Sequence, residues 1–334
     1  MKRTLFIGML GLSALMSGYA QQGEGVRKGR IVREPLVHDP VMAKEGDTYY
    51  LYSTGHNVSF SSKDLSEWTI RHGVFPSPPQ WAMDSIPEYK GHTWAPDIIY
   101  YKGNYHLFYS CSAFGKNTSA IGHAYRKTLS PASDEPWTDT GAVIVSHSHD
   151  NFNAIDPNIV IDEEGNPWMT FGSFWGGIQL VRLTEDLTST LKPEKLYTIC
   201  TRQFEGASDV PSRSVNSVEA PFIFKHGDYY YLFVSYDFCC RGLKSDYKVV
   251  VGRSTRVTGP YVDKDGRELT RGGGSLVVDS NDEFVAIGHS AAYHFDGKDY
   301  FMAHGYSRSE DGASKLFFRE MTWDEEGWPL VSAE

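Results

Sequence analysis

The sequence has few cysteines, no long apolar run after its first twenty residues and no low-complexity linker. Its 334 residues include only four cysteines, Cys111, Cys200, Cys239 and Cys240. Four cysteines allow three disulfide pairings, and the adjacent pair Cys239-Cys240 fits no zinc-binding spacing. We therefore expect a structural role for the cysteines or none, and not a catalytic one. A membrane span needs about 18 or more apolar residues in succession, and the rest of the chain has no such run.

Positive charge is also in deficit. The chain has 32 Lys and Arg residues against 42 Asp and Glu, which gives a formal net charge of -10. This balance disfavours nucleic acid and anionic membranes as partners. It is compatible with a neutral substrate and a site lined by carboxylates. Aromatic residues make up 14% of the chain, which suits β-strands and, for part of the excess, stacking against sugars.

The first twenty residues are typical of a secretory signal peptide. Lys2-Arg3 forms a basic start, residues 5–16 form a short apolar stretch, and Gly18-Tyr19-Ala20 resembles a cleavage site. No cysteine follows that could carry a lipid anchor. We expect export to the periplasm or outside the cell, a polar lead-in over residues 21–32, and one domain over residues 33–334.

One pattern occurs five times along this domain. An ionisable residue precedes an apolar run, a turn containing glycine follows, and an aromatic strand completes a β-hairpin. The copies cover residues 39–53, 94–110, 155–171, 217–235 and 288–303. Additional strand-like segments at residues 58–68 and 249–255 suggest two hairpins per repeat. A repeat of this kind predicts an all-β fold, a five-bladed β-propeller with four-stranded blades around a central channel.

The propeller predicts where a site should lie. Equivalent positions on the inner strands meet at one end of the channel, and we assign them to five ionisable residues, Asp39, Asp97, Asp156, Glu219 and His289. Their spacings are 58, 59, 63 and 70 residues. Asp97 is the weakest member because it follows its proline instead of preceding it. For any single aspartate, turn formation is the competing explanation.

Carboxyl groups that share a channel suit general acid–base catalysis, as in glycoside hydrolysis. Glu219 has apolar neighbours and nearby like charges, and both raise a carboxyl pKa, so we expect it to be the acid. Asp39 follows His38, whose positive form favours an ionised base. Asp156 is then expected to keep Glu219 protonated and to orient it.

His147-Ser148-His149-Asp150 resembles a metal-binding cluster. It lies in a polar segment before the third repeat, and short motifs of this kind often mislead. We interpret it as a solvated loop, with a place on the channel rim as the alternative.

Six short motifs follow one another at the spacing of the blades: His38-Asp39-Pro40, Trp94-Ala95-Pro96-Asp97, Asn153-Ala154-Ile155-Asp156-Pro157, Ser173-Phe174-Trp175-Gly176-Gly177, Val218-Glu219-Ala220-Pro221 and Gly288-His289-Ser290. In this order the chain resembles glycoside hydrolase family 43, most closely its arabinan endo-1,5-α-L-arabinosidases, from about Arg33 to the C-terminus. The resemblance implies inversion, with Asp39 as general base, Glu219 as general acid and Asp156 as pKa modulator. An inverting pair has carboxyl groups roughly 6.5–9.5 Å apart.

The resemblance also implies the residues that line the sugar subsites: Trp94, Phe114, Gly115, Asn153, Ala154, Ile155, Ser173, Phe174 and Trp175. For the two tryptophans, packing between blades is the competing role. His289 resembles the family's axial histidine, which is associated with a calcium ion. Because calcium prefers six to eight oxygen ligands, water would have to fill most of the shell, and a histidine that tunes the carboxylates is the alternative.

Four functional hypotheses remain open at this stage. The first is a monomeric endo-arabinanase, favoured because the chain ends with its fifth repeat. The second is an exo-acting α-L-arabinofuranosidase or β-xylosidase of the same family. A retaining fructan-acting enzyme is disfavoured by Ala220 and Ile155, where that group has cysteine and arginine. A sugar-binding propeller without activity would not need three channel acids.

Overall fold

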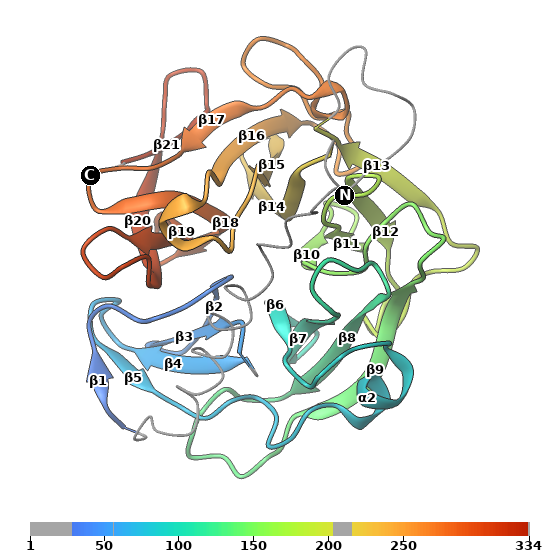
Figure 1. Ribbon diagram of the computed structural model, residues 1–334, viewed down its shortest axis with the longest axis vertical. Helices are drawn as coiled ribbons and strands as arrows, with labels where there is room; N and C mark the ends of the chain where they lie inside the picture. The colour runs from blue at the N-terminus through green and yellow to red at the C-terminus, as the bar shows by residue number, and fades with distance from the viewer. Residues whose placement is uncertain (1–28, 56, 203–215, 333–334) are drawn as a thin grey trace, which may run out of the picture.

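The computed structural model describes residues 29–55, 57–202 and 216–332 (Figure 1). The proposed signal peptide, and the lead-in up to residue 28, lie outside this part of the chain. Five antiparallel sheets are arranged around a common axis. This confirms the predicted five-bladed β-propeller.

Each blade is one sheet whose strands follow in sequence from the axis outward. The first blade contains β2 (Val41–Glu45), β3 (Thr48–Ser53), β4 (Val58–Ser62), β5 (Trp68–Ile70) and, at its outer edge, β1 (Ile31–Val32). The second contains β6 (Trp94–Tyr101), β7 (Asn104–Cys111), β8 (Ser119–Arg126) and β9 (Thr138–Ser146). The third contains β10 (Asn158–Ile161), β11 (Pro167–Phe171), β12 (Ile178–Arg182) and β13 (Leu196–Cys200).

The remaining blades follow the same plan. The fourth contains β14 (Val218–His226), β15 (Tyr229–Tyr236), β16 (Lys248–Ser254) and β17 (Ser275–Val278). The fifth contains β18 (Phe284–Phe295), β19 (Lys298–Ser307), β20 (Ser314–Trp323) and β21 (Pro329–Val331). Short helices lie between strands: α2 (Gln80–Ser85), η1 (Gly242–Lys244) and η2 (Leu269–Arg271). In the described part of the chain, no helix has the length and apolar character needed to span a membrane.

The second strand of each blade shows why these sequences form a propeller. In β15 every residue after Tyr229 is buried, and in β3 every residue after Thr48 is buried. A strand that is covered on both faces reads as a continuous apolar run and not as an alternating one. The hydrophobic cores accordingly lie between adjacent blades, and each blade depends on its neighbours for burial.

The ring closes where the two ends of the domain meet. Successive inner strands contact one another in a complete circle, β2 with β6, β10, β14, β18 and back to β2. Residues 35–37 then run beside β20: the Val37 N–H donates to the Ser314 carbonyl at 3.1 Å, and the Leu316 N–H donates to the Pro35 carbonyl at 3.0 Å. The blade structure begins at β1, two residues before the predicted start of the domain.

Candidate active site

Each blade has a non-glycine residue with positive φ at the same point of the repeat, inside the inner strand or two residues before it. These residues are Asp39 at 56°, Ala95 at 38°, Asp156 at 58°, Ala220 at 54° and His289 at 51°. Side chains rarely adopt this conformation, and such residues cluster at functional sites. One per blade, at the same point of the repeat, makes them the structurally equivalent set.

A ring of hydrogen bonds holds these five residues. The backbone N–H of each donates to a side chain of the preceding blade: Asp39 to His304 Nδ1 at 3.1 Å, Ala95 to Thr54 Oγ1 at 2.8 Å, Asp156 to Ser110 Oγ at 3.0 Å, Ala220 to Asp156 Oδ2 at 3.2 Å and His289 to Ser235 Oγ at 2.8 Å. The ring therefore joins every pair of neighbouring blades at one end of the channel.

This register corrects our alignment of the repeats. In the second and fourth blades the equivalent residues are Ala95 and Ala220, so Asp97 lies two positions later and Glu219 one position earlier. Strand pairing slips at both places, between Trp94 and Asp97 and between Glu219 and Phe222. The local irregularity turns Glu219 towards the ring and carries Asp97 away from it.

Asp97 has a structural role in the next layer of the channel. Its carboxylate is buried and accepts hydrogen bonds from the Ile159 N–H at 2.7 Å and from Asn158 Nδ2 at 3.3 Å. Asn158 Oδ1 in turn accepts from the Ile223 N–H at 2.8 Å. Burial raises the pKa of Asp97 to about 7, against these hydrogen bonds. Asp97 thus links the second blade to the third by hydrogen bonds and is not grouped with Asp39, Asp156 and Glu219.

Asp39 is held between two imidazoles and a hydroxyl. His38 Nδ1 lies 2.8 Å and His289 Nδ1 2.9 Å from the same carboxylate oxygen, and Thr54 Oγ1 donates to the other oxygen. Burial alone would raise the pKa of Asp39, but the positive charges of His289 and His38 outweigh it and hold that pKa well below its usual range. Burial opposes the positive charge of His289 as well, yet Asp39 raises the pKa of His289 to about 9. Asp39 is therefore an ionised carboxylate.

His304 supports Asp39 in a different way. It accepts the Asp39 backbone N–H at Nδ1, so the ring proton must be on Nε2. Its 3.6 Å approach to the Asp39 carboxylate is consequently a contact between two acceptors and not an ion pair. Burial, with the charge of His38 adding to it, lowers the pKa of His304 well below its usual value. A neutral His304 stacks on His38 at a centroid distance of 3.7 Å and fixes its orientation.

Asp156 and Glu219 form a connected pair from neighbouring blades. Asp156 Oδ2 accepts the N–H of Ala220, the residue that follows Glu219. Burial raises the pKa of Asp156 to about 8, and the negative charges of Glu219 and Asp39 add to this. Asp156 therefore carries a proton at neutral pH in the substrate-free protein.

Glu219 is placed by two short contacts. Ser173 Oγ donates to Glu219 Oε2 at 2.7 Å, and Cys239 Sγ donates to Oε1 at 3.5 Å. The Phe174 N–H also donates to the Val218 carbonyl at 2.8 Å. The segment 173–175 is thereby tied to the strand that carries Glu219. Asp39, Asp156 and Glu219 come together at one end of the channel, as the repeats predicted.

A family model for glycosyl hydrolases family 43 matches residues 30–329. The chain belongs to glycoside hydrolase family 43. This agrees with the resemblance seen in the sequence motifs, and it makes the protein a glycosidase by family.

Three relatives place the chain within the family. It is 49% identical to the extracellular exo-α-(1→5)-L-arabinofuranosidase ArbA of Cellvibrio japonicus, over 88% of this chain and 86% of the relative. It is 40% identical to the extracellular endo-α-(1→5)-L-arabinanase 1 of Bacillus subtilis, over 88% and 87%. The solved Cellvibrio cellulosa α-L-arabinanase in complex with arabinohexaose is 48% identical, with a TM-score of 0.86 over 90% of this chain and 96% of that one.

Six of the nine residues predicted to bind sugar in this family 43 chain fall into two groups. Ser173, Phe174 and Trp175 lie beside Glu219, and the rings of Phe174 and Phe238 are 5.7 Å apart. Both Phe174 and Trp175 have positive φ, which marks a constrained segment. Asn153, Ala154 and Ile155 directly precede Asp156 and are buried.

Buried residues of the second group mainly hold the backbone. Asn153 Oδ1 accepts from Ser119 Oγ at 2.7 Å, and the Ala154 N–H donates to Ser146 Oγ at 2.9 Å. Trp94 Nε1 donates to His92 Nδ1 at 3.0 Å, beside the ring residue Ala95. Phe114 and Gly115 lie in the connection between β7 and β8, where Phe114 is 52% exposed. An exposed aromatic at this position is available to a sugar ring.

Sequence reasoning missed the residues that hold the ring. Thr54, Ser110 and Ser235 lie within one residue of the end of the second strand in their blades, and His304 lies three residues before the end of β19. A partial signal was present, since the aromatic stretches of the second and fourth repeats end in Ser110 and Ser235. The same strand ends carry the hydrogen-bond acceptors that position the catalytic candidates.

The polar segment 147–150 is the expected loop, between β9 and β10. His147 and His149 side chains are 63% and 81% exposed, and Asp150 Oδ2 accepts the His147 N–H at 2.7 Å. All four cysteines are free thiols. Cys111 and Cys200 are fully buried, as suits a packing role, whereas Cys239 and Cys240 lie next to the candidate acid and base.

His289 alone makes a poor calcium cage. Its Nδ1 is engaged by Asp39, which leaves one ring nitrogen for an ion. Within the described ranges, the groups of side chains that could hold a metal do not include His289. Because calcium prefers six to eight oxygen ligands, water would have to supply most of them.

Proposed function

We propose that this chain is an exported, inverting glycosidase that hydrolyses the α-1,5-L-arabinofuranosidic bonds of arabinan. The observation that carries the proposal is the pairing of opposite protonation states in one channel. Asp39 is kept ionised by two histidines, while Asp156, the neighbour of Glu219, keeps a proton at neutral pH. Inverting hydrolysis requires one carboxylate and one carboxylic acid on opposite sides of the scissile bond.

In this mechanism Asp39 accepts a proton from the attacking water as its oxygen bonds to the anomeric carbon. Glu219 donates a proton to the departing glycosidic oxygen as the bond to the anomeric carbon breaks. Asp156 is a positioning residue that acts on Glu219 through the Ala220 N–H. Ser173 orients the Glu219 carboxyl by its hydrogen bond to Oε2.

The substrate assignment is supported by the relatives, which are named for α-1,5-linked arabinose polymers. The greater identity to the exo-acting relative favours the release of short products from one chain end. The sequence argument for internal cleavage relied on the absence of an additional domain, yet this chain spans 86% of the exo-acting relative. Internal cleavage stays the second candidate.

The proposal of export is supported by observations that are independent of the mechanism. The apolar N-terminal segment predicts secretion, and both named relatives are described as extracellular. We also retain calcium near His289 as a proposal, limited to an ion held mainly by water. Such an ion would add positive charge beside the three carboxyl groups.

Product analysis on linear α-1,5-arabinan tests the proposed function. Wild-type protein should release arabinose or short oligosaccharides whose new reducing ends are first seen by NMR as the β-anomer. Asp39→Asn and Glu219→Gln should each lower the rate by about 10²–10⁴-fold. Asp97→Asn is the matched control, because it removes a buried carboxylate of an inner strand outside the catalytic ring.

The outcomes separate the alternatives. Release of single arabinose units from arabinan indicates exo action. A rapid fall in the viscosity of the arabinan solution, with mixed oligosaccharides as products, indicates endo action. Initial α-anomer would point to retention. Binding of arabinan without cleavage, unaffected by Glu219→Gln, would replace the enzyme by a sugar-binding propeller.

A further inference from the structure

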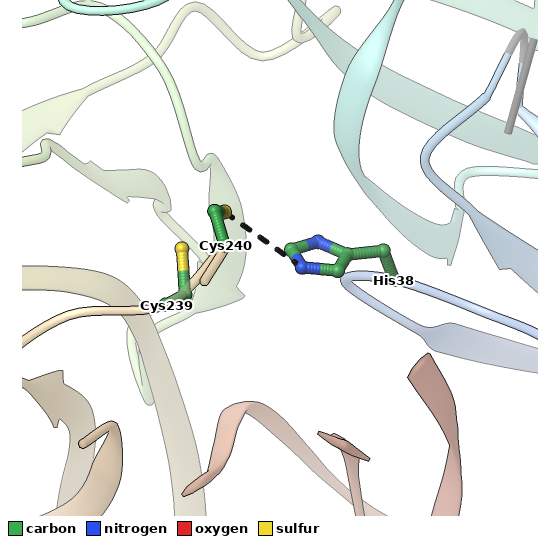
Figure 2. Close-up of side chains that lie close together, drawn as sticks. All are labelled: His38, Cys239 and Cys240. Atoms are coloured by element: carbon green, nitrogen blue, oxygen red, sulfur yellow. Dashed lines mark hydrogen bonds between the residues drawn. The ribbon is translucent and has the colours of Figure 1, made fainter. Parts of the chain in front are cut away.

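Two cysteines and a histidine from opposite parts of the sequence meet beside the catalytic candidates (Figure 2). His38 precedes β2, whereas Cys239 and Cys240 lie in the segment between β15 and η1. His38 Nε2 is 3.9 Å from Cys240 Sγ, and the ligand atoms of all three residues lie within 4.8 Å of one another. Neither the proposed hydrolysis nor the ring of hydrogen bonds uses the two thiols as a pair.

We propose that His38, Cys239 and Cys240 form a binding site for one thiophilic divalent cation, with Zn²⁺ as the reference ion, and that occupancy inhibits the hydrolase. Two thiolates and one imidazole are a ligand set typical of zinc. With Zn–S bonds of about 2.3 Å and Zn–N bonds of about 2.0 Å, tetrahedral ligands lie roughly 3.3–3.8 Å apart. The observed separation of 3.9 Å between His38 and Cys240 requires only a small movement.

The other nitrogen of His38 is arranged as zinc sites require. Nδ1 lies 2.8 Å from the Asp39 carboxylate. Histidines that ligate metals usually direct their second ring nitrogen to a carboxylate, which fixes the tautomer and strengthens the ligand. Tyr306 OH now lies 3.0 Å from Nε2 and also accepts the Cys240 N–H at 2.7 Å. An ion would replace the first of these contacts and leave the second in place.

Glu219 completes the argument for inhibition. Its Oε1 lies 3.5 Å from Cys239 Sγ, within reach of an ion's fourth coordination position. A bound cation would compete for the carboxyl that must donate a proton, and it would hold His38 in one form against Asp39. The inhibitory consequence rests on the proposed function, whereas the binding site does not.

The site is accessible and chemically selective. His38, Cys239 and Cys240 are each partly exposed, so an ion can enter without unfolding the blades. Binding releases the thiol protons to solvent. The thiolates favour soft or borderline ions over calcium and magnesium, which prefer oxygen. This donor set is therefore distinct from the water-held calcium considered at His289.

Metal binding is measured first, on the full chain in metal-free buffer with a phosphine reductant. Equilibrium dialysis should give one Zn²⁺ per chain, and Co²⁺ should produce a thiolate-to-metal absorption band. The Cys239→Ser/Cys240→Ser double variant should lose the band and bind Zn²⁺ at least about 100-fold more weakly, since even residues that only support metal ligands contribute 10–100-fold. Cys111→Ala, at a buried cysteine of β7, is the control and should bind like wild type.

Unchanged affinity in the double variant, or no stoichiometric binding by reduced wild type, would overturn the site. Arabinan hydrolysis is then compared with and without saturating Zn²⁺, each variant relative to its own zinc-free rate. Wild type should lose activity at least tenfold, and the double variant should not. Zinc binding without inhibition would remove the regulatory part alone. A zinc-free wild type that does not cleave arabinan would refute the proposed function, while the dialysis and the Co²⁺ band still decide the site.

Discussion

Replacing Asp156 by asparagine should stabilise the protein at neutral pH while it lowers activity. Asp156 is buried and has a pKa of about 8. In the unfolded chain the same group ionises near its ordinary pKa of about 3.9. Folding at pH 7 therefore includes the cost of protonating this carboxyl. Asparagine is already neutral, tolerates positive φ well, and keeps an oxygen to accept the Ala220 N–H.

The magnitude follows from linkage. One pKa unit corresponds to about 1.4 kcal/mol, so a group held protonated at pH 7 against a pKa of about 3.9 costs up to about 4 kcal/mol. We expect a gain of about 2–4 kcal/mol in the unfolding free energy of Asp156→Asn at pH 7. The sign is fixed by the raised pKa: the folded wild type binds more protons than the unfolded chain between about pH 4 and 8. Its stability falls across this window as pH rises.

Urea unfolding of wild type and Asp156→Asn at pH 4 and pH 7 measures the effect. The difference between the two proteins should be small at pH 4 and large at pH 7. A variant that is less stable than wild type at pH 7, or a difference that does not change with pH, would refute the assigned protonation of Asp156. The arabinan assay should show reduced turnover in the same variant, since the carboxyl group beside Glu219 is lost.

Three further outcomes test the site. Activity of the wild type should fall above about pH 8, as Asp156 loses its proton, and should persist below pH 4 because the pKa of Asp39 is depressed. Thr54→Val removes a hydrogen bond to the charged Asp39 carboxylate, and such a bond contributes about 1.5–3 kcal/mol. The acidic limb of the pH–rate profile should therefore move to higher pH, and the rate should fall about 10–100-fold. Chelation with EGTA should affect turnover less than His289→Ala does, because the imidazole holds Asp39 directly; a larger effect of EGTA would contradict our view of the calcium site.

The blades could be predicted from the sequence because hairpins leave a local signal. An apolar strand, a glycine turn and an aromatic strand recur five times, and each was found as a strand pair. Asp39 and Asp156 were also placed correctly, since a proline after each marks the same point of the repeat. The predicted alignment of the repeats was wrong in the second and fourth blades. There the slip in pairing around Ala95 and Ala220 depends on backbone geometry, which short-range residue patterns do not report.

The protonation of the site could not be derived from neighbours in sequence. Glu219 has apolar neighbours in the chain, but Asp156 is the group whose pKa burial raises to about 8. Asp39 owes its state to His289 as well as to His38, and only the closure of the ring brings His289 to it. The cluster of His38, Cys239 and Cys240 escaped notice for the same reason, because its histidine lies 202 positions from the nearer thiol.

Because the ring closes between the first and fifth blades, the candidate active site is complete only after the fifth blade has been synthesised. Asp39 belongs to the first blade to leave the ribosome, yet its backbone partner His304 lies 265 residues later. Contacts between such distant residues form late in folding. Until the fifth blade has formed, Asp39 lacks both His289 and His304. The nascent chain therefore does not yet have the complete candidate active site.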